Sequence, residues 1–220
     1  MRPFRNLFYL GKYCNKLSVD IRMQSNFSKY RYFLPIQTRC ADNDYYGHVN
    51  NSQYHFYCDT VVNTYLIWYC GLSTDRVNTT ALAYMIQTQC IYKKPFIFPQ
   101  VILAGLGVKK VGKSSVHYEV AFFEPKIDYN IAMEEKRHAE SNNHDPLLIL
   151  GIGSQGLLVT ENKVDVLKDM ERHYHTEPSV TGFPVHVFVD PKTQRPLKCL
   201  PNHLASGLDK VFMMDKASKL

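Results

Sequence analysis

The chain has 220 residues, of which 45% are hydrophobic and 21% charged, and its formal net charge is +6 at pH 7. This length suffices for one good core, and the composition is that of a globular protein. No apolar run approaches the ~18 residues that a membrane-spanning helix needs. No zinc-finger, basic-zipper or RNA-binding signature accompanies the basic charge, which argues against a nucleic-acid partner. The six Cys form no CxxC pair, so we interpret them as reduced thiols of an intracellular protein.

The two ends of the chain suggest different compartments. Residues 1–40 hold eight Lys or Arg and one acid, Asp20, which is typical of a mitochondrial transit peptide or of a disordered basic leader. The chain terminates in Ser218, Lys219 and Leu220, the peroxisomal address that an import receptor reads at a free C-terminus. Because three specified residues at one fixed place rarely coincide by chance, we expect peroxisomal localisation. The mitochondrion and the cytoplasm are the alternatives.

The first predicted element is a strand over residues 30–42. Its side chains alternate, which places Leu34, Ile36, Thr38 and Cys40 on one face. Pro35 indicates either the beginning of this strand or an edge of the sheet, because proline has no N–H to donate.

A long helix of about 20 residues, hence about 30 Å in length, follows this strand. Asn50 or Asn51 can cap its start, and Gly71 stands where a helix C-cap is expected. Because apolar side chains cover much of its circumference, we expect the helix to be largely buried. The apolar positions with helical spacing are Tyr54, Tyr57, Cys58, Val61, Val62, Tyr65, Leu66 and Tyr69.

Further strands and one short helix complete the predicted domain. The order of strand, long helix and several strands predicts an α+β fold, in which a curved antiparallel sheet wraps around one long central helix. The later strands are expected over residues 81–92, 100–110, 114–123 and 183–190, with a hairpin turn at 111–113, and the short helix over residues 201–212.

Residues 124–181 interrupt this order with a mixed polar and apolar pattern, and we interpret them as an insertion between late strands. The chain then divides into a basic leader (1–30), a single domain that includes the insertion (31–212) and a C-terminal tail (213–220). Within the insertion, "GIGSQG" (151–156) matches G-x-G-x-x-G. The residues after it resemble a strand more than a helix, and no second βαβ unit follows, which argues against a dinucleotide site.

A dense polar cluster, "RCADNDYYGHVNNSQY", precedes the long helix. It fails as an EF-hand because Tyr46 and Gln53 stand where calcium ligands are needed. No spaced His/Cys set completes a metal site with Asp42, Asp44 and His48, so such a site stays a minor alternative and no metal is expected. Helix capping explains one or two of the polar residues. Helix-start N–H groups can also hold a carbonyl oxygen while a carboxylate attacks the carbonyl carbon or activates water, which predicts acyl transfer.

The cluster resembles the signature of hot-dog-fold acyl-CoA thioesterases of the 4-hydroxybenzoyl-CoA thioesterase-like group, roughly R-x-x-D-x-D-x-x-G-H-V-N-N-x-x-Y. The similarity continues over roughly residues 33–123 and 183–208. It implies a hot-dog fold and hydrolysis of an acyl-CoA thioester to the free acid and coenzyme A. No cofactor is expected, because coenzyme A is part of the substrate. The matching positions are Arg39, Asp42, Asp44, Gly47, His48, Val49, Asn50, Asn51 and Tyr54.

The resemblance also implies roles for single residues. Asp44 matches the catalytic carboxylate, as nucleophile or as general base, and the Asn51 backbone N–H would polarise the thioester carbonyl. Gly47 and His48 would shape the loop, with His48 contacting the substrate or orienting Asp44, and Asp42 would be structural. Basic side chains would bind the phosphates of coenzyme A. The candidates are Lys109, Lys110 and Lys113, for which a solvated turn is the alternative, and Tyr57, Val61 and Tyr84 for the acyl pocket.

Such enzymes pair their sheets, so a homodimer or a dimer of dimers is expected, with sites at the interface. Three other functions stay open. The first is a hot-dog protein that binds acyl-CoA without hydrolysing it. The second is a hot-dog hydratase or dehydratase acting on enoyl or hydroxyacyl thioesters, for which His48 would act with Asp44. The third is an interaction protein whose basic leader reaches anionic surfaces.

Overall fold

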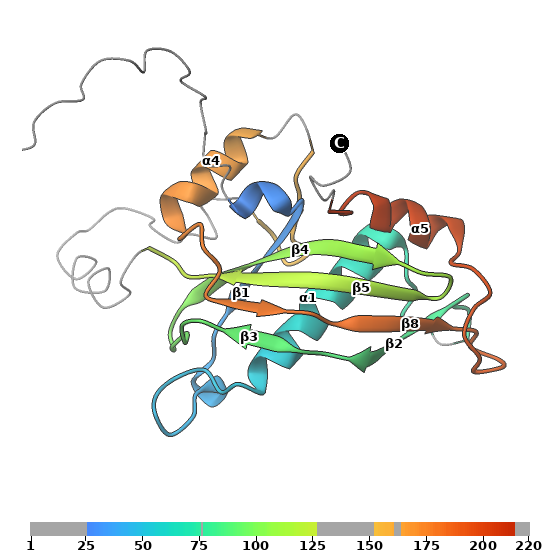
Figure 1. Cartoon of the computed structure of the whole chain (residues 1–220), viewed down its shortest axis with the longest axis horizontal. Coiled ribbons are helices and arrows are strands. Elements are labelled where there is room, and N and C mark those ends of the chain that lie inside the picture. Colours follow the sequence, from blue (N-terminus) through green and yellow to red (C-terminus); the bar gives the residue numbers. More distant parts are fainter. Residues whose placement is uncertain (1–25, 76, 127–151, 161–163, 214–220) are drawn as a thin grey trace, which may run out of the picture.

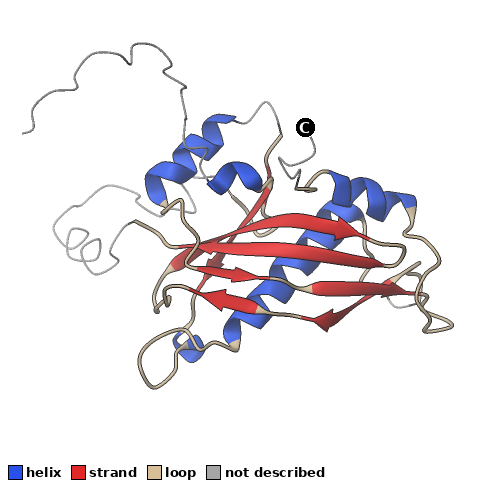
Figure 2. Cartoon of the chain, viewed as in Figure 1, coloured by secondary structure: helices blue, strands red, loops and turns tan. Residues whose placement is uncertain are grey.

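A curved antiparallel sheet wraps around one long helix in the computed structural model of the protein (Figures 1 and 2). The structure describes residues 26–75, 77–126, 152–160 and 164–213. The predicted α+β architecture is confirmed. The leader up to residue 25, much of the predicted insertion (127–151 and 161–163) and the tail from residue 214, with Ser218, Lys219 and Leu220, lie outside the described residues.

Within the described residues, eight strands form the sheet: β1 (Tyr32–Gln37), β2 (Leu82–Gln87), β3 (Cys90–Tyr92), β4 (Val101–Val111), β5 (Ser115–Phe123), β6 (Leu157–Leu158), β7 (Val180–Gly182) and β8 (Val185–Val189). The main path runs β2–β8–β5–β4–β1–β6, and β7 pairs with both β3 and β5. The predicted hairpin is confirmed as the β4–β5 pair, which runs from Leu103 opposite Phe123 to Val111 opposite Val116 with one register shift between Val108 and Lys110.

The central helix α1 (Gln53–Cys70) crosses behind the sheet in Figure 1. The predicted apolar positions are buried along it, apart from the half-buried Tyr69. The helix ends at Gly71, whose φ of 68° lies in the left-handed region that glycine adopts without strain. At the other end, Asn50 Oδ1 accepts hydrogen bonds from the N–H and the hydroxyl of Ser52, at 3.0 and 2.8 Å.

The first strand is shorter than predicted. β1 pairs with β6 only over its first two residues, so at Pro35 it is an edge strand, as the missing proline N–H favours. Cys40, predicted on the strand face, lies instead in the 3-10 helix η2 (Cys40–Asp42). There the Asp42 carboxylate accepts a hydrogen bond from the Arg39 N–H at 2.7 Å, which curls the chain away from the extended conformation.

The prediction of a single strand over residues 81–92 is wrong, because the chain forms two strands there. β2 pairs with β8 and β3 with β7, and the two strands are separated by Thr88 and Gln89. The strands paired with them, β7 and β8, are also separate, with Phe183 and Pro184 between them. The Phe183 N–H donates to the Gln89 carbonyl at 2.7 Å, but Pro184 has no N–H with which to continue the ladder.

The inner face of the sheet packs on α1, and the helix α5 (Asn202–Asp209), which was predicted, packs along α1. The Tyr65 hydroxyl of α1 donates to the Gly207 carbonyl of α5 at 2.6 Å. A Cβ at Gly207 would lie 2.5 Å from Cys70 Sγ and 2.9 Å from the Cys70 Cα. Glycine therefore allows the two helices to approach this closely.

The outer face of the sheet is covered by a second hydrophobic cluster. The 3-10 helix η1 (Asn26–Lys29), residues 152–159 and the helix α4 (Val164–His173) supply its cover over β1, β4 and β5. The sequence analysis did not predict α4, which lies within the predicted insertion. The buried residues of this second hydrophobic cluster are Phe27, Tyr30, Phe33, Leu103, Ala121, Phe123, Ile152, Val159, Met170 and Tyr174.

The part of the G-x-G-x-x-G motif that the structure describes leads into β6, which pairs antiparallel to β1. A dinucleotide site needs a helix directly after the glycines, and none follows here before β6. A Cβ at Gly156 would lie 2.5 Å from the Tyr32 ring. The glycine therefore serves the packing of this segment against β1.

Candidate active site

The polar cluster forms a tight turn in front of α1. The Asp44 N–H donates to the His48 carbonyl at 2.7 Å, and the Gly47 N–H donates to the Asp44 carbonyl at 3.1 Å. Gly47 has a φ of +78°, and a Cβ there would meet nothing within 4 Å. Glycine is therefore favoured here by the left-handed backbone conformation and not by a lack of space. The Val49 N–H donates to the Phe96 carbonyl at 2.8 Å, which ties the turn to the segment before β4.

Asp42 is fully buried and holds the base of this turn. Its carboxylate accepts hydrogen bonds from the Arg39 Nη2 and from the Tyr57 hydroxyl, both at 2.7 Å. Burial by itself would raise the pKa of Asp42, but the hydrogen bonds from Arg39 and Tyr57 outweigh it and lower the pKa below its usual value. Asp42 is therefore a structural carboxylate. The Tyr57 hydroxyl is occupied by its hydrogen bond to Asp42, and Tyr57, a predicted acyl-pocket residue, does not line the pocket described next.

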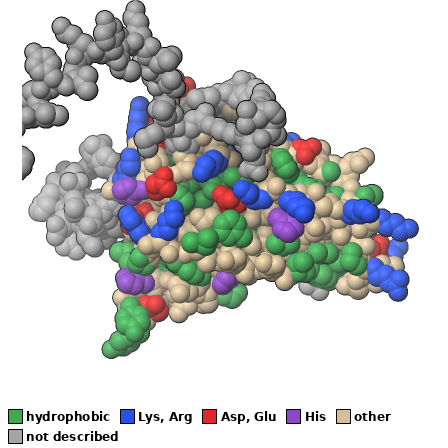
Figure 3. Space-filling model, in the orientation of Figure 1, with side chains coloured by type: hydrophobic (Ala, Val, Ile, Leu, Met, Phe, Trp, Pro, Cys, Tyr) green, Lys and Arg blue, Asp and Glu red, His purple; other side chains and the backbone are tan. Residues whose placement is uncertain are grey.

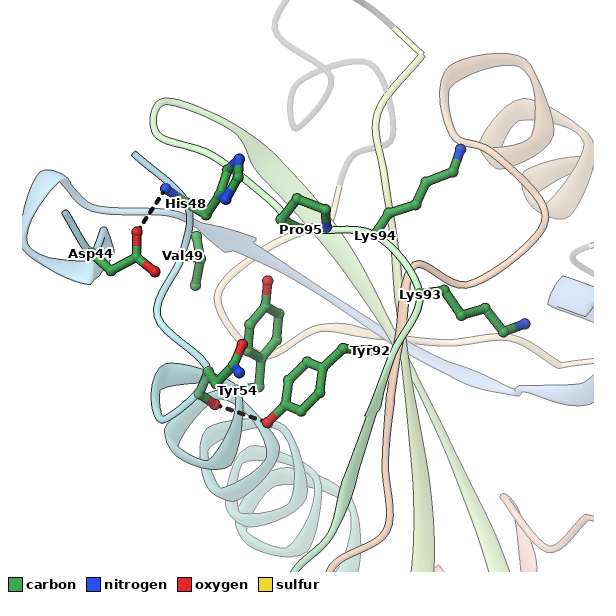
Figure 4. Close-up of a pocket in the computed structure, with 9 residues that line it drawn as sticks. Asp44, His48, Val49, Tyr54, Tyr92, Lys93, Lys94 and Pro95 are labelled. Carbon is green, nitrogen blue, oxygen red and sulfur yellow. Dashed lines mark hydrogen bonds between the residues drawn. The ribbon is translucent and has the colours of Figure 1, made fainter. Parts of the chain in front are cut away.

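A pocket opens between the turn, the start of α1 and the segment after β3 (Figure 4). It encloses about 190 Å³. In Figure 4 the Asp44 carboxylate lies at one side of it and the Lys93 and Lys94 side chains extend on the other side. The residues that line the pocket are Asp44, His48, Val49, Asn51, Tyr54, Tyr92, Lys93, Lys94 and Pro95.

The half-buried Asp44 carboxylate has one oxygen held by the turn and one left free. Oδ1 accepts hydrogen bonds from the N–H group of Tyr46, at 2.8 Å, and from the N–H group of His48, at 3.2 Å (Figure 4). Oδ2 accepts no hydrogen bond from any residue that the structure describes. The turn thus orients the carboxylate and leaves one oxygen available for chemistry.

Asn51 contributes a backbone N–H without a partner among the described residues. The amides on either side are occupied: Asn50 donates to the Asp42 carbonyl at 2.8 Å and Ser52 donates to Asn50 Oδ1 at 3.0 Å. Asn51 stands just before Ser52, the N-cap residue of α1, and so lies near the end of the helix where the dipole is positive. The Tyr92 hydroxyl donates to the Asn51 carbonyl at 3.1 Å, which holds the residue in place.

His48 is exposed at the pocket, and its imidazole forms no hydrogen bond with a described residue. Of the two predicted roles, the backbone N–H of His48 performs the orientation of Asp44, whereas the imidazole does not. The ring is therefore free to meet a bound molecule.

The other predicted binding residues do not line this pocket. Lys109, Lys110 and Lys113 belong to the β4–β5 hairpin and its turn, where Lys109 forms an ion pair with Glu119 at 3.5 Å. Two of the predicted acyl-pocket residues also lie elsewhere. Val61 is in the core, and Tyr84 on β2 is half-exposed, with its hydroxyl donating to Gln194 Oε1 at 3.0 Å.

Sequence reasoning missed the segment from Tyr92 to Pro95, which supplies nearly half of the pocket lining. A usable signal was present, since two adjacent lysines followed by a proline directly after a strand mark an exposed basic turn. Nothing local, however, connects this segment with Asp44, because the two meet only through the folding of the sheet.

The described part of the chain contains neither a membrane-spanning helix nor a cluster of metal-binding side chains. None of its helices is both long and apolar enough to cross a bilayer. Within the same residues, no three His, Cys, Asp or Glu side chains gather in a way that could hold a metal ion.

The sequence model of the thioesterase-like superfamily matches residues 38–145. This stretch includes the turn, α1 and the strands β2 to β5. The match covers just under half of the chain, which is similar to this superfamily over this stretch. The match supports the hot-dog fold and the thioester hydrolase predicted from the motif. No curated protein sequence matches the chain.

Solved structures show the same fold. The PA5185 protein of Pseudomonas aeruginosa strain PAO1 is 29% identical, with a TM-score of 0.59 and coverage of 86% of this chain and 96% of that chain. A predicted thioesterase from Bacillus stearothermophilus has 13% identity, a TM-score of 0.52 and coverage of 84% and 98%. A 1,4-dihydroxy-2-naphthoyl-CoA thioesterase from Synechocystis has 12% identity, a TM-score of 0.52 and coverage of 81% and 95%.

Proposed function

We propose that this thioesterase-like protein hydrolyses an acyl-CoA thioester to a carboxylic acid and coenzyme A, with Asp44 as the catalytic carboxylate. One observation carries the proposal. Asp44 and Asn51 line the same pocket at the positive end of α1, and neither Asp44 Oδ2 nor the Asn51 N–H has a partner among the described residues.

In this pocket the thioester carbonyl would accept a hydrogen bond from the Asn51 N–H. Attack on the carbonyl carbon places negative charge on that oxygen, and the amide and the helix dipole stabilise the charge. Asp44 Oδ2 either attacks the carbon itself or takes a proton from the attacking water. The bond between the carbonyl carbon and the sulfur of coenzyme A then breaks as the carbonyl re-forms, and the departing thiolate takes up a proton. After direct attack by Asp44, water hydrolyses the resulting mixed anhydride, which releases the acid and restores the carboxylate. His48 is exposed beside the reacting atoms and can contact the substrate.

Coenzyme A is long and carries several phosphates, and the pocket has basic side chains at the end opposite Asp44. Lys93 and Lys94 are exposed on the side away from Asp44 (Figure 4). We therefore place the phosphates near these two lysines when the thioester lies at Asp44. The hairpin residues Lys109, Lys110 and Lys113 do not line this pocket, and they are candidates for phosphate contacts made from a second copy of the chain.

A homodimer is the proposed working form. β2 is an edge strand, and the exposed fractions of Tyr84 and Ile86 on it are 47% and 62%. Figure 3 shows hydrophobic side chains exposed along the side of the sheet where β2 lies. An unpaired edge with apolar side chains favours pairing with a second copy. The pocket volume of about 190 Å³ is below the ~300 Å³ of typical small-molecule sites, so a second copy would complete its walls. Light scattering after gel filtration measures the assembly.

Peroxisomal import through Ser218, Lys219 and Leu220 stays a prediction. A fluorescent fusion that keeps the C-terminal carboxylate, compared with the same fusion lacking these three residues, tests it. Import that requires the three residues supports the receptor interaction.

The test of the proposed function is thiol release from short, medium, long and aromatic acyl-CoA esters. The intact protein is compared with Asp44→Asn and with Asp209→Asn, a matched change at an exposed carboxylate of α5. We expect release that falls by about 100-fold or more in Asp44→Asn and is unchanged in Asp209→Asn.

Full activity of Asp44→Asn would contradict the assignment of the carboxylate. Absence of thiol release from every ester, with a long-lived acyl-CoA complex, would favour the non-hydrolytic binding protein. Hydration of an enoyl-CoA without thiol release would favour the hydratase.

A further inference from the structure

Two cysteines meet behind the pocket, and the proposed hydrolysis does not use them. Cys58 on α1 and Cys90 on β3 place their thiols next to each other. Both sulfurs lie against Gly182 on β7: a Cβ there would be 2.3 Å from Cys58 Sγ and 3.5 Å from Cys90 Sγ. The absence of a side chain at Gly182 thus makes room for two thiols in one place.

His55, one helical turn before Cys58, adds a base to this pair. Its Nδ1 lies 3.8 Å from Cys90 Sγ and 3.2 Å from Thr88 Oγ1. An imidazole nitrogen in this position can accept the proton of the Cys90 thiol, and the thiolate is the reactive form of cysteine.

The two thiols differ in access and in acidity. Cys90 is half-buried, whereas Cys58 is fully buried, so a small solute can reach only Cys90. Hydrogen bonds from Cys58 and Tyr92 lower the pKa of Cys90 against the opposite effect of burial. The hydrogen bond to Cys90, together with burial, raises the pKa of Cys58. This asymmetry is that of an attacking thiol and a resolving thiol.

We propose that Cys90 and Cys58 form a reversible dithiol site for hydrogen peroxide, in which Cys90 attacks and Cys58 resolves. The Cys90 sulfur attacks one peroxide oxygen, the O–O bond breaks, and hydroxide leaves and becomes water with the thiol proton. The Cys58 sulfur then attacks the sulfenic sulfur of Cys90, the S–O bond breaks, and a second water leaves. Two thiols are oxidised to one disulfide, and one peroxide is reduced to two waters.

The position of the cross-link connects it with the pocket. It would join α1 to β3 one helical turn after Tyr54 and two residues before Tyr92, and both tyrosines line the pocket. The chemistry of the thiols does not depend on the proposed hydrolysis, so a negative result for one proposal does not contradict the other.

The experiment uses the reduced, unmodified full chain. After treatment with hydrogen peroxide, the remaining thiols are blocked, the protein is digested without reductant, and peptides are identified by mass spectrometry. We expect a linked Cys58–Cys90 peptide pair that dithiothreitol separates. Because this step needs no substitution, a variant that fails to fold cannot obscure it.

Two variants identify the roles of the thiols. In Cys58→Ser the reaction should stop at a sulfenic acid on Cys90, which dimedone traps. Cys40→Ser removes an exposed thiol outside the cluster and should leave the Cys58–Cys90 link unchanged. Oxidation of Cys40 or Cys199 with no linked Cys58–Cys90 pair would overturn the proposal, as would the absence of a dimedone adduct on Cys90 in a folded Cys58→Ser protein.

Discussion

His186 on β8 predicts a specific loss of stability at acidic pH. Its side chain is 1% exposed, and neither ring nitrogen has a hydrogen-bond partner among the described residues. The ring packs edge-on against Tyr118, with centroids 5.5 Å apart. Burial lowers the pKa of His186 from 6.5 to about 4. The imidazole is therefore neutral in the folded protein over a range in which the unfolded chain binds a proton.

The sign and size of the effect follow from this difference. Below about pH 6.5 the unfolded state gains a proton that the folded state does not take up, so the free energy of unfolding falls until about pH 4. Each pKa unit corresponds to about 1.4 kcal/mol, which makes the full loss about 3 kcal/mol. About 2 kcal/mol of it is expected between about pH 7.5 and about pH 5.

The assay is urea unfolding, followed by circular dichroism, at these two pH values. His186→Leu removes the titrating ring but keeps an apolar side chain of moderate size, and its loss of stability on acidification should be smaller than that of the parent by about 2 kcal/mol. His203→Gln, at an exposed position of α5, is the matched control and should behave like the parent. An equal pH dependence for the parent and His186→Leu would refute the reasoning.

Two further predictions concern the pocket. Tyr92→Phe removes the hydrogen bond to the Asn51 carbonyl; it should lower kcat by about 2- to 10-fold, the effect of one net hydrogen bond, with KM nearly unchanged. A change confined to KM would show that Tyr92 only binds substrate. The double substitution Lys93→Ala and Lys94→Ala should raise KM for acyl-CoA about five-fold, from roughly 0.5 kcal/mol for each exposed charge. The same acyl group on pantetheine, which lacks the phosphates, is the control, and an equal rise for both esters would contradict phosphate binding.

The long helix and the β4–β5 hairpin could be predicted because their signals are local. In α1 the apolar residues recur with the helical period and Gly71 ends the pattern, so the same face is buried whatever it packs against. In the hairpin the alternation of Val116, Tyr118 and Val120 is the period of a strand. Neither signal depends on a distant residue.

The helix α4 and the division of residues 81–92 could not be predicted in this way. α4 joins the hydrophobic cluster that contains Phe27, Phe33 and Phe123, which come from three segments far from it in the chain. The division of the strand follows from Pro184 on the opposite side of the ladder. In both cases the deciding partner lies outside the local pattern, and only its position in the fold makes it a neighbour.

The sequence by itself determined the family motif, the α+β order of elements and Asp44 and Asn51 as candidate reacting groups. Only the tertiary structure decided which polar groups stay available. Arg39 and Tyr57 occupy the Asp42 carboxylate, whereas Asp44 Oδ2 and the Asn51 N–H have no partner among the described residues. The physical reason is that hydrogen bonds are satisfied by whichever groups the fold brings within reach, and Tyr92, 41 residues from Asn51 in the chain, reaches it only because β3 lies beside the start of α1.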